Sequence, residues 1–244
     1  MKYLGDFFKA LGFLTILPCP RRFASMDDYS RVCGWFPVAG AVVGGILYLS
    51  ARFLFFPVFS PLAASASVVA LWAFLTRGFH LDGLADTFDG IGGGHDWESR
   101  LAIMKDSRLG TFGGISLASV LLLKTVLLAE FGGRLETLWL APVMGRWSML
   151  VGMRFFPSAR PGGMGETFRA LCSGNQLTLA SLAAFWAVLL LGGLHGLPLL
   201  VMVPALAYLL SRWLCRMLGG LTGDSYGALC EITELAVLVF FAAL

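Results

Sequence analysis

The stretch GFHLDGLADTFDGIGGGHDWESRLAIMKDSRLG, residues 78–110, decides how the rest of this chain is interpreted. It holds six of the fifteen carboxylates of the protein, whereas long apolar segments lie on either side of it. Ionisable groups beside such segments are costly near a membrane and often mark a functional site. The six acids are Asp82, Asp86, Asp89, Asp96, Glu98 and Asp106.

Three of these acids, Asp82, Asp86 and Asp89, fall on one face of a helix, within an arc of roughly 60°. Like charges at this spacing destabilise a helix, and a divalent cation would remove the repulsion. Oxygen ligands without a cysteine favour Mg²⁺ or Mn²⁺ over zinc. We therefore predict that the three aspartates bind Mg²⁺ and act in catalysis. The alternative is a helix face that is only exposed to solvent. Such a face would normally carry Lys or Arg between the acids, and none occurs between Arg77 and Arg100.

The composition defines the class of protein. Charged residues make up 14% of the chain and hydrophobic residues 57%, with a mean hydropathy of +0.78. Soluble domains contain about 25% charged residues. We predict an all-α, polytopic membrane protein whose partner is the lipid bilayer, with no nucleic-acid partner. The five cysteines form no CxxC pair, which argues against a disulfide framework or a structural zinc site.

Six to seven segments are long and apolar enough to cross a bilayer. They are 34–56, 61–81, 111–131, 135–156, 177–194, 197–218 and a short last one at 231–244. Residues 1–18 place five apolar residues on one helical face and three charged residues elsewhere, and predict an interfacial amphipathic helix. The apolar residues are Leu4, Phe7, Phe8, Leu11 and Leu14, and the charged ones are Lys2, Asp6 and Lys9. The whole chain, 1–244, is expected to form one membrane-embedded domain.

The distribution of Lys and Arg predicts the topology. Fourteen lie in alternate connecting segments and only one in the others. By the positive-inside rule the rich segments are cytoplasmic. This places the acidic stretch, the 154–176 loop and the 212–230 segment on one face of the membrane, with the C-terminus on the other.

The length of a membrane span predicts the position of the acidic helix. A helix that begins after Pro61 crosses the bilayer by about Asp82, so the acids should begin where the hydrocarbon ends. Gly90 and Gly92–Gly94 should end this helix, and Asp96 should cap a short following helix. We expect His80, which lies away from the aspartates, to hydrogen-bond near the lipid headgroups.

A second acidic segment, 212–235, is expected to face the first. Its glycines suggest a phosphate-binding loop, and Asp224, Glu231 and Glu234 share one helical face. We hypothesise that Asp224, with one of these glutamates, faces Asp82 across a cavity and that one acid serves as general base. Alternatively, the glutamates pair with Arg212 or Arg216. The predicted substrate-binding residues are Lys105, Asp106, Ser107, Arg108, Thr222, Glu231 and Glu234; Arg154, Arg160 and Arg169 bind phosphates or mark the inner surface.

Acids, Mg²⁺ and arginines at a membrane boundary suggest chemistry on a diphosphate. Displacement at phosphorus and ionisation of a prenyl diphosphate both fit these residues. A divalent-cation transporter is the non-enzyme alternative, but its carboxylates should lie mid-span. Here the predicted mid-span ionisable residues are the cations Arg52, Lys124 and Arg146.

Five segments resemble the cobalamin-5′-phosphate synthase (adenosylcobinamide-GDP ribazoletransferase) family. They are FLTILP (13–18), WFPVAGAVVGG (35–45), HLDGLADTFDGIGGG (80–94), RLAIMKDSRLGTFG (100–113) and GGLTGDSYGALCEITEL (219–235). The motif also has features of CDP-alcohol phosphatidyltransferases, but Asp86 stands where the arginine of their D-G-x-x-A-R pattern belongs.

The resemblance implies a bacterial inner-membrane enzyme of adenosylcobalamin synthesis, active on the cytoplasmic face. Such an enzyme joins adenosylcobinamide-GDP to α-ribazole 5′-phosphate, or to α-ribazole, and releases GMP with Mg²⁺ present. In that mechanism the ribazole hydroxyl attacks the phosphorus nearest the cobinamide. Asp82, Asp86 and Asp89 match the motif to which the metal is assigned. A homo-oligomer is compatible with the sequence.

Overall fold

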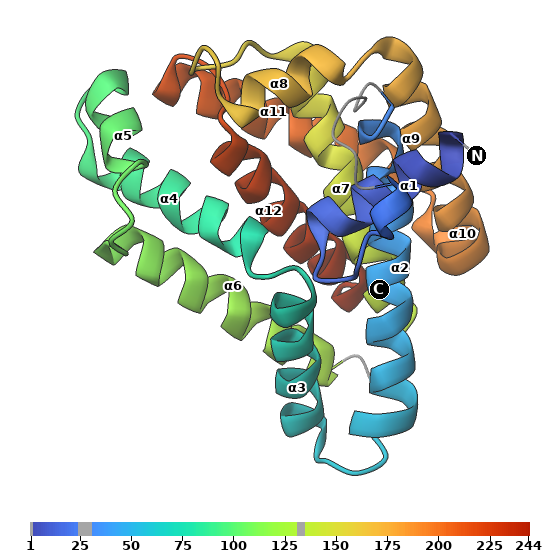
Figure 1. Cartoon of the computed structure of the whole chain (residues 1–244). Coiled ribbons are helices and arrows are strands. Elements are labelled where there is room, and N and C mark those ends of the chain that lie inside the picture. The colour runs from blue at the N-terminus through green and yellow to red at the C-terminus, as the bar shows by residue number, and fades with distance from the viewer. Residues whose placement is uncertain (1, 24–30, 131–134) are drawn as a thin grey trace.

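The computed structural model describes residues 2–23, 31–130 and 135–244, and these residues form a helical bundle (Figure 1). The α-helices are α1 (Lys2–Leu14), α2 (Phe36–Ser50), α3 (Pro61–Leu75), α4 (Phe79–Gly93), α5 (Trp97–Ile103), α6 (Thr111–Glu130), α7 (Thr137–Phe155), α8 (Met164–Leu171), α9 (Gly174–Ala187), α10 (Gly193–Gly196), α11 (Leu199–Leu218) and α12 (Gly223–Ala242). Short 3₁₀ or π turns occupy Arg21–Phe23, Cys33–Trp35, Ala51–Phe55 and Val188–Gly192. No β-strand occurs in these ranges, so the predicted all-α class is confirmed.

Five helical segments are long and apolar enough to cross a membrane, or six if α3 and α4 form one broken span. The five are Cys33–Phe55, Thr111–Glu130, Gly174–Gly196, Leu199–Leu218 and Gly223–Ala242. The last span is therefore longer than predicted, because its helix begins at Gly223 rather than near residue 231. The predicted span 135–156 corresponds to α7, which carries Arg146 and Arg154 and is less apolar than the others.

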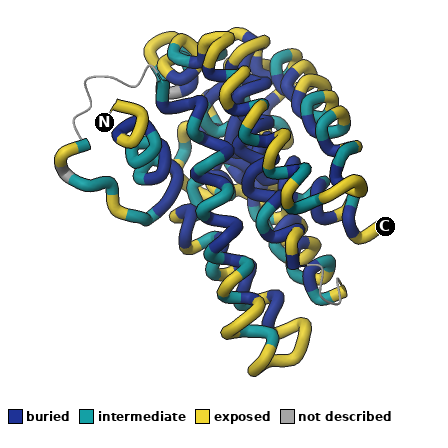
Figure 2. Tube along the Cα trace, turned by 90° about the vertical axis from the view of Figure 1, so that its right-hand side faces the viewer, coloured by how far each residue is buried: buried dark blue, intermediate teal, exposed yellow. Residues whose placement is uncertain are grey.

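Helix α7 forms the centre of the bundle, with α2 and α12 packed against it (Figure 1). Figure 2 shows the buried residues gathered in the interior of the bundle. Nearly every residue of α7 is buried. Small residues on α2 allow the close approach: a Cβ at Gly40 would lie 2.5 Å from the Pro142 carbonyl oxygen, and one at Gly44 would lie 2.6 Å from the Trp139 Cα. Helices in membranes commonly associate through such small residues.

The chain turns sharply between α3 and α4, and this differs from the prediction of one helix over 61–81. Arg77 (φ +56°) and Gly78 (φ +65°) both adopt the left-handed conformation, which cannot continue a right-handed helix. The axes of the two helices differ in direction by 89°. The acidic helix α4 therefore runs across α3 instead of extending it (Figure 1).

Helix α4 is held between α6 and α12 (Figure 1). A Cβ at Gly83 would lie 2.6 Å from the Asp224 carbonyl oxygen, and one at Gly227 would lie 3.0 Å from the His80 carbonyl oxygen. Gly223 and Gly227 belong to α12, so the predicted glycine loop is confined to the residues before this helix. Gly83 and Gly227 instead bring the backbones of α4 and α12 together.

Helix α1 packs on the bundle through Ala10, Leu11 and Leu14, all buried. The prediction of a helix with a polar face was partly wrong, since Asp6 points inward and accepts a 2.8 Å hydrogen bond from Arg31 Nε. The segment after α1 is tied to the end of α3, where the Ile16 amide donates to the Leu75 carbonyl at 2.8 Å. This arrangement places α1 beside the start of α4.

Candidate active site

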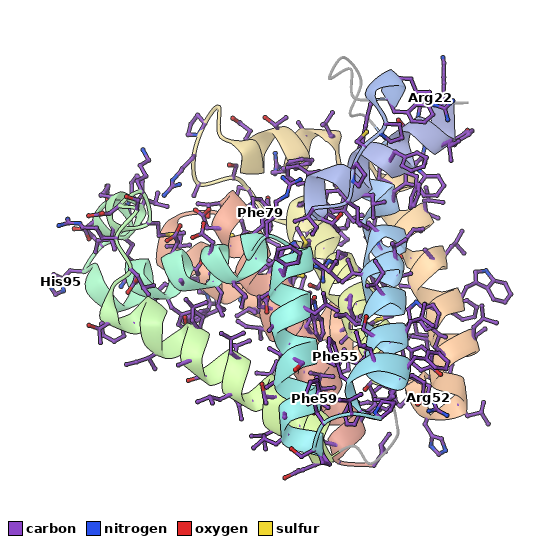
Figure 3. The ribbon with its side chains drawn as sticks, turned by 60° about the horizontal axis from the view of Figure 1, so that its bottom comes forward. Arg22, Arg52, Phe55, Phe59, Phe79 and His95 are labelled. Atoms are coloured by element: carbon purple, nitrogen blue, oxygen red, sulfur yellow. The ribbon has the colours of Figure 1, made fainter. Side chains whose placement is uncertain are left out.

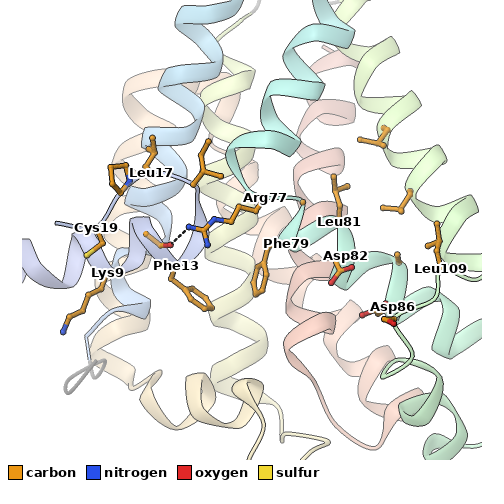
Figure 4. Close-up of a pocket in the computed structure, with 18 residues that line it drawn as sticks. Lys9, Phe13, Leu17, Cys19, Arg77, Phe79, Leu81, Asp82, Asp86 and Leu109 are labelled. Atoms are coloured by element: carbon orange, nitrogen blue, oxygen red, sulfur yellow. Dashed lines mark hydrogen bonds between the residues drawn. The ribbon is translucent and has the colours of Figure 1, made fainter. Parts of the chain in front are cut away.

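A cavity of about 970 Å³ opens between α1, the α3–α4 turn and the first two turns of α4 (Figure 4). Segment 16–19, residues of the α5–α6 loop and two leucines of α6 complete its walls. The residues that line it include Lys9, Gly12, Phe13, Arg77, Phe79, Leu81, Asp82, Asp86, Ser107 and Leu109. The cavity thus combines an apolar lining with acidic and basic groups.

Asp82 and Asp86 both line this cavity, as one helical face would place them (Figure 4). Asp82 is exposed and Asp86 is half-buried. Neither carboxylate makes a hydrogen bond or ion pair with another residue in the described ranges. Asp86 is surrounded by the like charges of Asp82, Asp224 and Asp89, with Arg160 as the compensating cation. This arrangement would attract a cation or a cation-bound ligand.

Asp89 has different surroundings from the other two aspartates. Its side chain is buried, and its Oδ2 and Oδ1 accept hydrogen bonds from the amides of Gly110 (2.7 Å) and Gly113 (2.8 Å). A carboxylate at the start of a helix satisfies amides that lack an intrahelical partner. Asp89 therefore joins α4 to the first turn of α6.

The donor set fits a hard divalent cation only in part. Within the described ranges, no group of three or more His, Cys, Asp or Glu side chains is arranged to hold a metal ion. Asp82 and Asp86 offer oxygens toward the cavity, whereas both oxygens of Asp89 already accept backbone hydrogen bonds. Two carboxylates plus substrate oxygens are a usual environment for Mg²⁺. Binding of Mg²⁺ by the three aspartates remains a prediction.

Asp224 lies in the first turn of α12, near Asp86 on the acidic face of α4. Its Oδ2 accepts a hydrogen bond from Thr222 Oγ1 at 3.3 Å and lies 3.5 Å from Arg160 NH1. Arg160 also donates to the Leu101 carbonyl at 2.8 Å, which links the 154–176 loop to α5. Thr222 caps α12 by accepting from the Ser225 amide at 3.2 Å. Asp224 and Arg160 thus lie near Asp86, but Asp224 is not among the residues that line the cavity, so its predicted position across the cavity stays a prediction.

Glu231 and Glu234 lie elsewhere, inside the bundle. Lys124 Nζ of α6 donates to Glu231 Oε2 at 2.7 Å and to Glu234 Oε2 at 2.5 Å. Arg146 of α7 forms an ion pair with the other oxygen of Glu234, and its NH2 lies 3.3 Å from His80 Nδ1. The alternative pairing with Arg212 or Arg216 is therefore wrong, and so is the expected headgroup contact of His80.

This cluster also corrects an argument made from the sequence. The buried cations Lys124 and Arg146 do not stand alone, because acids of α12 lie at the same depth and neutralise them. Buried charges in a membrane protein are usually paired in this way. An excess of mid-span cations therefore cannot be used against a transporter.

The short helix α5 begins as predicted. Asp96 caps it by accepting a 2.8 Å hydrogen bond from the Ser99 amide, which lowers the pKa of Asp96. Beyond this helix, hydrogen bonds from Arg108 hold the pKa of Asp106 at about 2, below its usual value. Of the four residues proposed there for substrate binding, Ser107 lines the cavity and Lys105 is exposed.

Several cavity residues were not identified from the sequence. Lys9 and Phe13 come from α1, and Arg77 comes from the α3–α4 turn. A signal for Arg77 was present, because it stands three residues before His80 of the central motif. The motif FLTILP (13–18) marked this part of the chain, but that α1 forms a wall of the site depends on contacts between distant parts of the chain.

The fold and the cavity define the chain as a helical, multi-pass type of membrane protein with an acidic site at the bend between α3 and α4. The sequence profile of the family described as Cobalamin-5-phosphate synthase matches residues 6–242. The chain belongs to this family.

Relatives that match along nearly the whole chain carry one name, adenosylcobinamide-GDP ribazoletransferase. The protein of Roseiflexus sp. (strain RS-1) is 43% identical over 94% of this chain and 86% of its own length. The protein of Herpetosiphon aurantiacus is 41% identical over 100% and 97%. That of Escherichia coli O17:K52:H18 is 40% identical over 96% and 97%. No solved structure matches this chain.

Proposed function

We propose that this protein is an adenosylcobinamide-GDP ribazoletransferase. It joins the phospho-cobinamide group of adenosylcobinamide-GDP to α-ribazole 5′-phosphate, or to α-ribazole, and releases GMP. The family membership and the names of the relatives support this proposal. The structural observation that supports an active site for this reaction is that Asp82 and Asp86 of the central motif line one cavity.

In this proposal the residues at the cavity have different roles. Asp82 and Asp86 hold Mg²⁺, with Asp89 behind them fixing α4 against α6. Mg²⁺, when bound, would neutralise the diphosphate and stabilise the departing phosphate of GMP. The apolar residues Phe13 and Phe79 offer surface for the large, partly apolar cobinamide.

Asp224 is the candidate general base for the acceptor hydroxyl. The glutamates of the second acidic segment are engaged with Lys124 and Arg146, which leaves Asp224 as the acid of that segment near the site. Its contacts with Thr222 and Arg160 fix its orientation. A proton acceptor must lie within hydrogen-bond reach of the hydroxyl it activates.

We also propose that the enzyme resides in the bacterial inner membrane with its site on the cytoplasmic face. The apolar helices, the bacterial relatives and the alternation of Lys and Arg along the chain support this placement.

Product analysis tests the function. Purified protein in liposomes is incubated with adenosylcobinamide-GDP, α-ribazole 5′-phosphate and Mg²⁺, and we expect GMP and adenosylcobalamin 5′-phosphate in equal amounts. The Asp86→Asn variant and a reaction without acceptor serve as controls. Absence of both products from folded wild-type protein, or equal GMP release without acceptor, would reject the proposal.

A further inference from the structure

The cavity has charged groups of opposite sign on facing walls. Asp82 and Asp86 belong to α4, whereas Lys9 and Arg77 come from α1 and the α3–α4 turn (Figure 4). The guanidinium of Arg77 points toward Gly12 of α1, away from Asp82, so it is not an ion-pair partner of the acids. The basic wall is thus separate from the acidic one.

The backbone of Arg77 adopts a conformation that ordinary side chains avoid. Its φ of +56° is the only positive value at a non-glycine residue in the described ranges. An L-residue costs energy in the left-handed region, which glycine would avoid, and such outliers tend to occur where function requires a particular side chain. The sharp turn alone would accept glycine at this position, as it does at Gly78.

Most N–H donors of the Arg77 side chain are not hydrogen-bonded to a described residue. The side chain is exposed to the cavity, and its one hydrogen bond to a described residue is a long contact, 3.4 Å from NH2 to the Gly12 carbonyl oxygen. A guanidinium carries five N–H donors in a planar fork that matches two oxygens of a phosphate. A ligand phosphate could take up these donors without breaking an ion pair.

We propose that Arg77 binds a phosphate monoester on the acceptor nucleoside, across the cavity from the aspartates. This inference rests on the proposed function, in which the diphosphate of the donor is held at Asp82 and Asp86. A second, dianionic phosphate would be repelled by those carboxylates and requires a cation on another wall. Arg77 supplies that cation and makes the enzyme favour a phosphorylated acceptor.

The test compares two acceptors that differ only in this phosphate. GMP release is measured with α-ribazole 5′-phosphate and with α-ribazole, for wild-type protein and for Arg77→Gly, Arg77→Lys and Arg52→Gln in phosphatidylcholine liposomes. Arg77→Gly removes the side chain while accepting the left-handed backbone. Arg52 lies in the turn Ala51–Phe55 that follows α2, away from the cavity, and serves as a matched control (Figure 3).

We expect Arg77→Gly to lower kcat/KM for the phosphorylated acceptor by about 10- to 100-fold, mainly through KM, because charge-assisted hydrogen bonds are lost. The unphosphorylated acceptor should change by less than about twofold, and thermal stability should not fall. Arg77→Lys should recover part of the loss, and Arg52→Gln should behave as wild type.

Other assignments of Arg77 give different results. An equal loss with both acceptors would make its role structural, and a change confined to the KM of adenosylcobinamide-GDP would place it at the donor diphosphate. An effect that appears only with phosphatidylglycerol present would assign it to a lipid headgroup. Each of these outcomes overturns the inference while wild-type turnover persists. Wild-type protein inactive with both acceptors would instead overturn the proposed function, and the inference with it.

Discussion

Lys124 of α6 and Glu234 of α12 form an ion pair inside the bundle, with Nζ 2.5 Å from Oε2. Their side chains are 4% and 0% exposed. Glu231 shares the lysine, and Arg146 of α7 holds the second oxygen of Glu234. Two positive and two negative charges therefore join three helices, and His80 extends the contact to α4 just before the acidic face.

Removing one charge from this cluster should destabilise the protein strongly. Lys124→Met leaves two glutamates against one arginine, and an uncompensated buried charge costs about 3–5 kcal/mol. We expect a large fall in the thermal unfolding temperature in detergent. The double variant Lys124→Met with Glu231→Gln restores the charge balance and should recover much of the loss. Equal stability of the single variant and wild type would contradict a paired, buried cluster.

The three aspartates of α4 should separate into two types. Asp82→Asn and Asp86→Asn remove charges that hold Mg²⁺ in the proposed mechanism, so turnover should fall at least about 100-fold. Stability should be kept, because the two carboxylates repel each other. Asp89→Asn leaves one backbone amide without an acceptor and should cost about 1–3 kcal/mol. GMP release and thermal unfolding, measured side by side, distinguish these effects. Full activity of both cavity variants would show that the cavity is not the active site.

Metal binding should depend on Asp82 and Asp86 more than on Asp89. Treatment with a chelator should abolish GMP release, and added Mg²⁺ should restore it. Bound Mn²⁺, followed by electron paramagnetic resonance, should be retained by Asp89→Asn better than by Asp86→Asn, because Asp86 offers its oxygens to the cavity. Activity that survives thorough chelation would remove the metal from the mechanism.

The contact between α4 and α12 should not tolerate a methyl group added at Gly83. Gly83→Ala would place a Cβ 2.6 Å from the Asp224 carbonyl oxygen, so α4 must move and the aspartates with it. We expect loss of stability and at least about a tenfold fall in turnover. Gly174→Ala is the matched control, since nothing lies within 4 Å of its Cβ. Wild-type behaviour of Gly83→Ala would contradict this packing.

The predicted sidedness can be tested with single cysteines. Ser60 and His95 are exposed at different ends of the fold, as the nearby Phe59 and the labelled His95 show in Figure 3. In a background without Cys19 and Cys215, we expect His95→Cys to react with an impermeant thiol reagent only from the cytoplasmic side. Ser60→Cys should react only from outside. The reverse pattern would overturn the proposed orientation.

The features that the sequence determined by itself depend on neighbouring residues. The apolar segments indicated a helical membrane protein, and the spacing of Asp82 and Asp86 placed both on one face. The role of Asp96 followed from its position before α5, because a helix cap is made within a few residues. The motifs also pointed to the correct family, since they keep their order along the chain.

Tertiary structure decided the features that depend on distant residues. Asp89 shares the helical face of Asp86, yet the amides of Gly110 and Gly113 satisfy its oxygens. Glu231 and Glu234 bond to a lysine 107 and 110 positions away, and no local periodicity encodes that choice of partner. The 89° turn at Arg77 directs α4 so that its acidic face lies beside α1. Only packing of the whole chain could show that a basic wall stands opposite the aspartates.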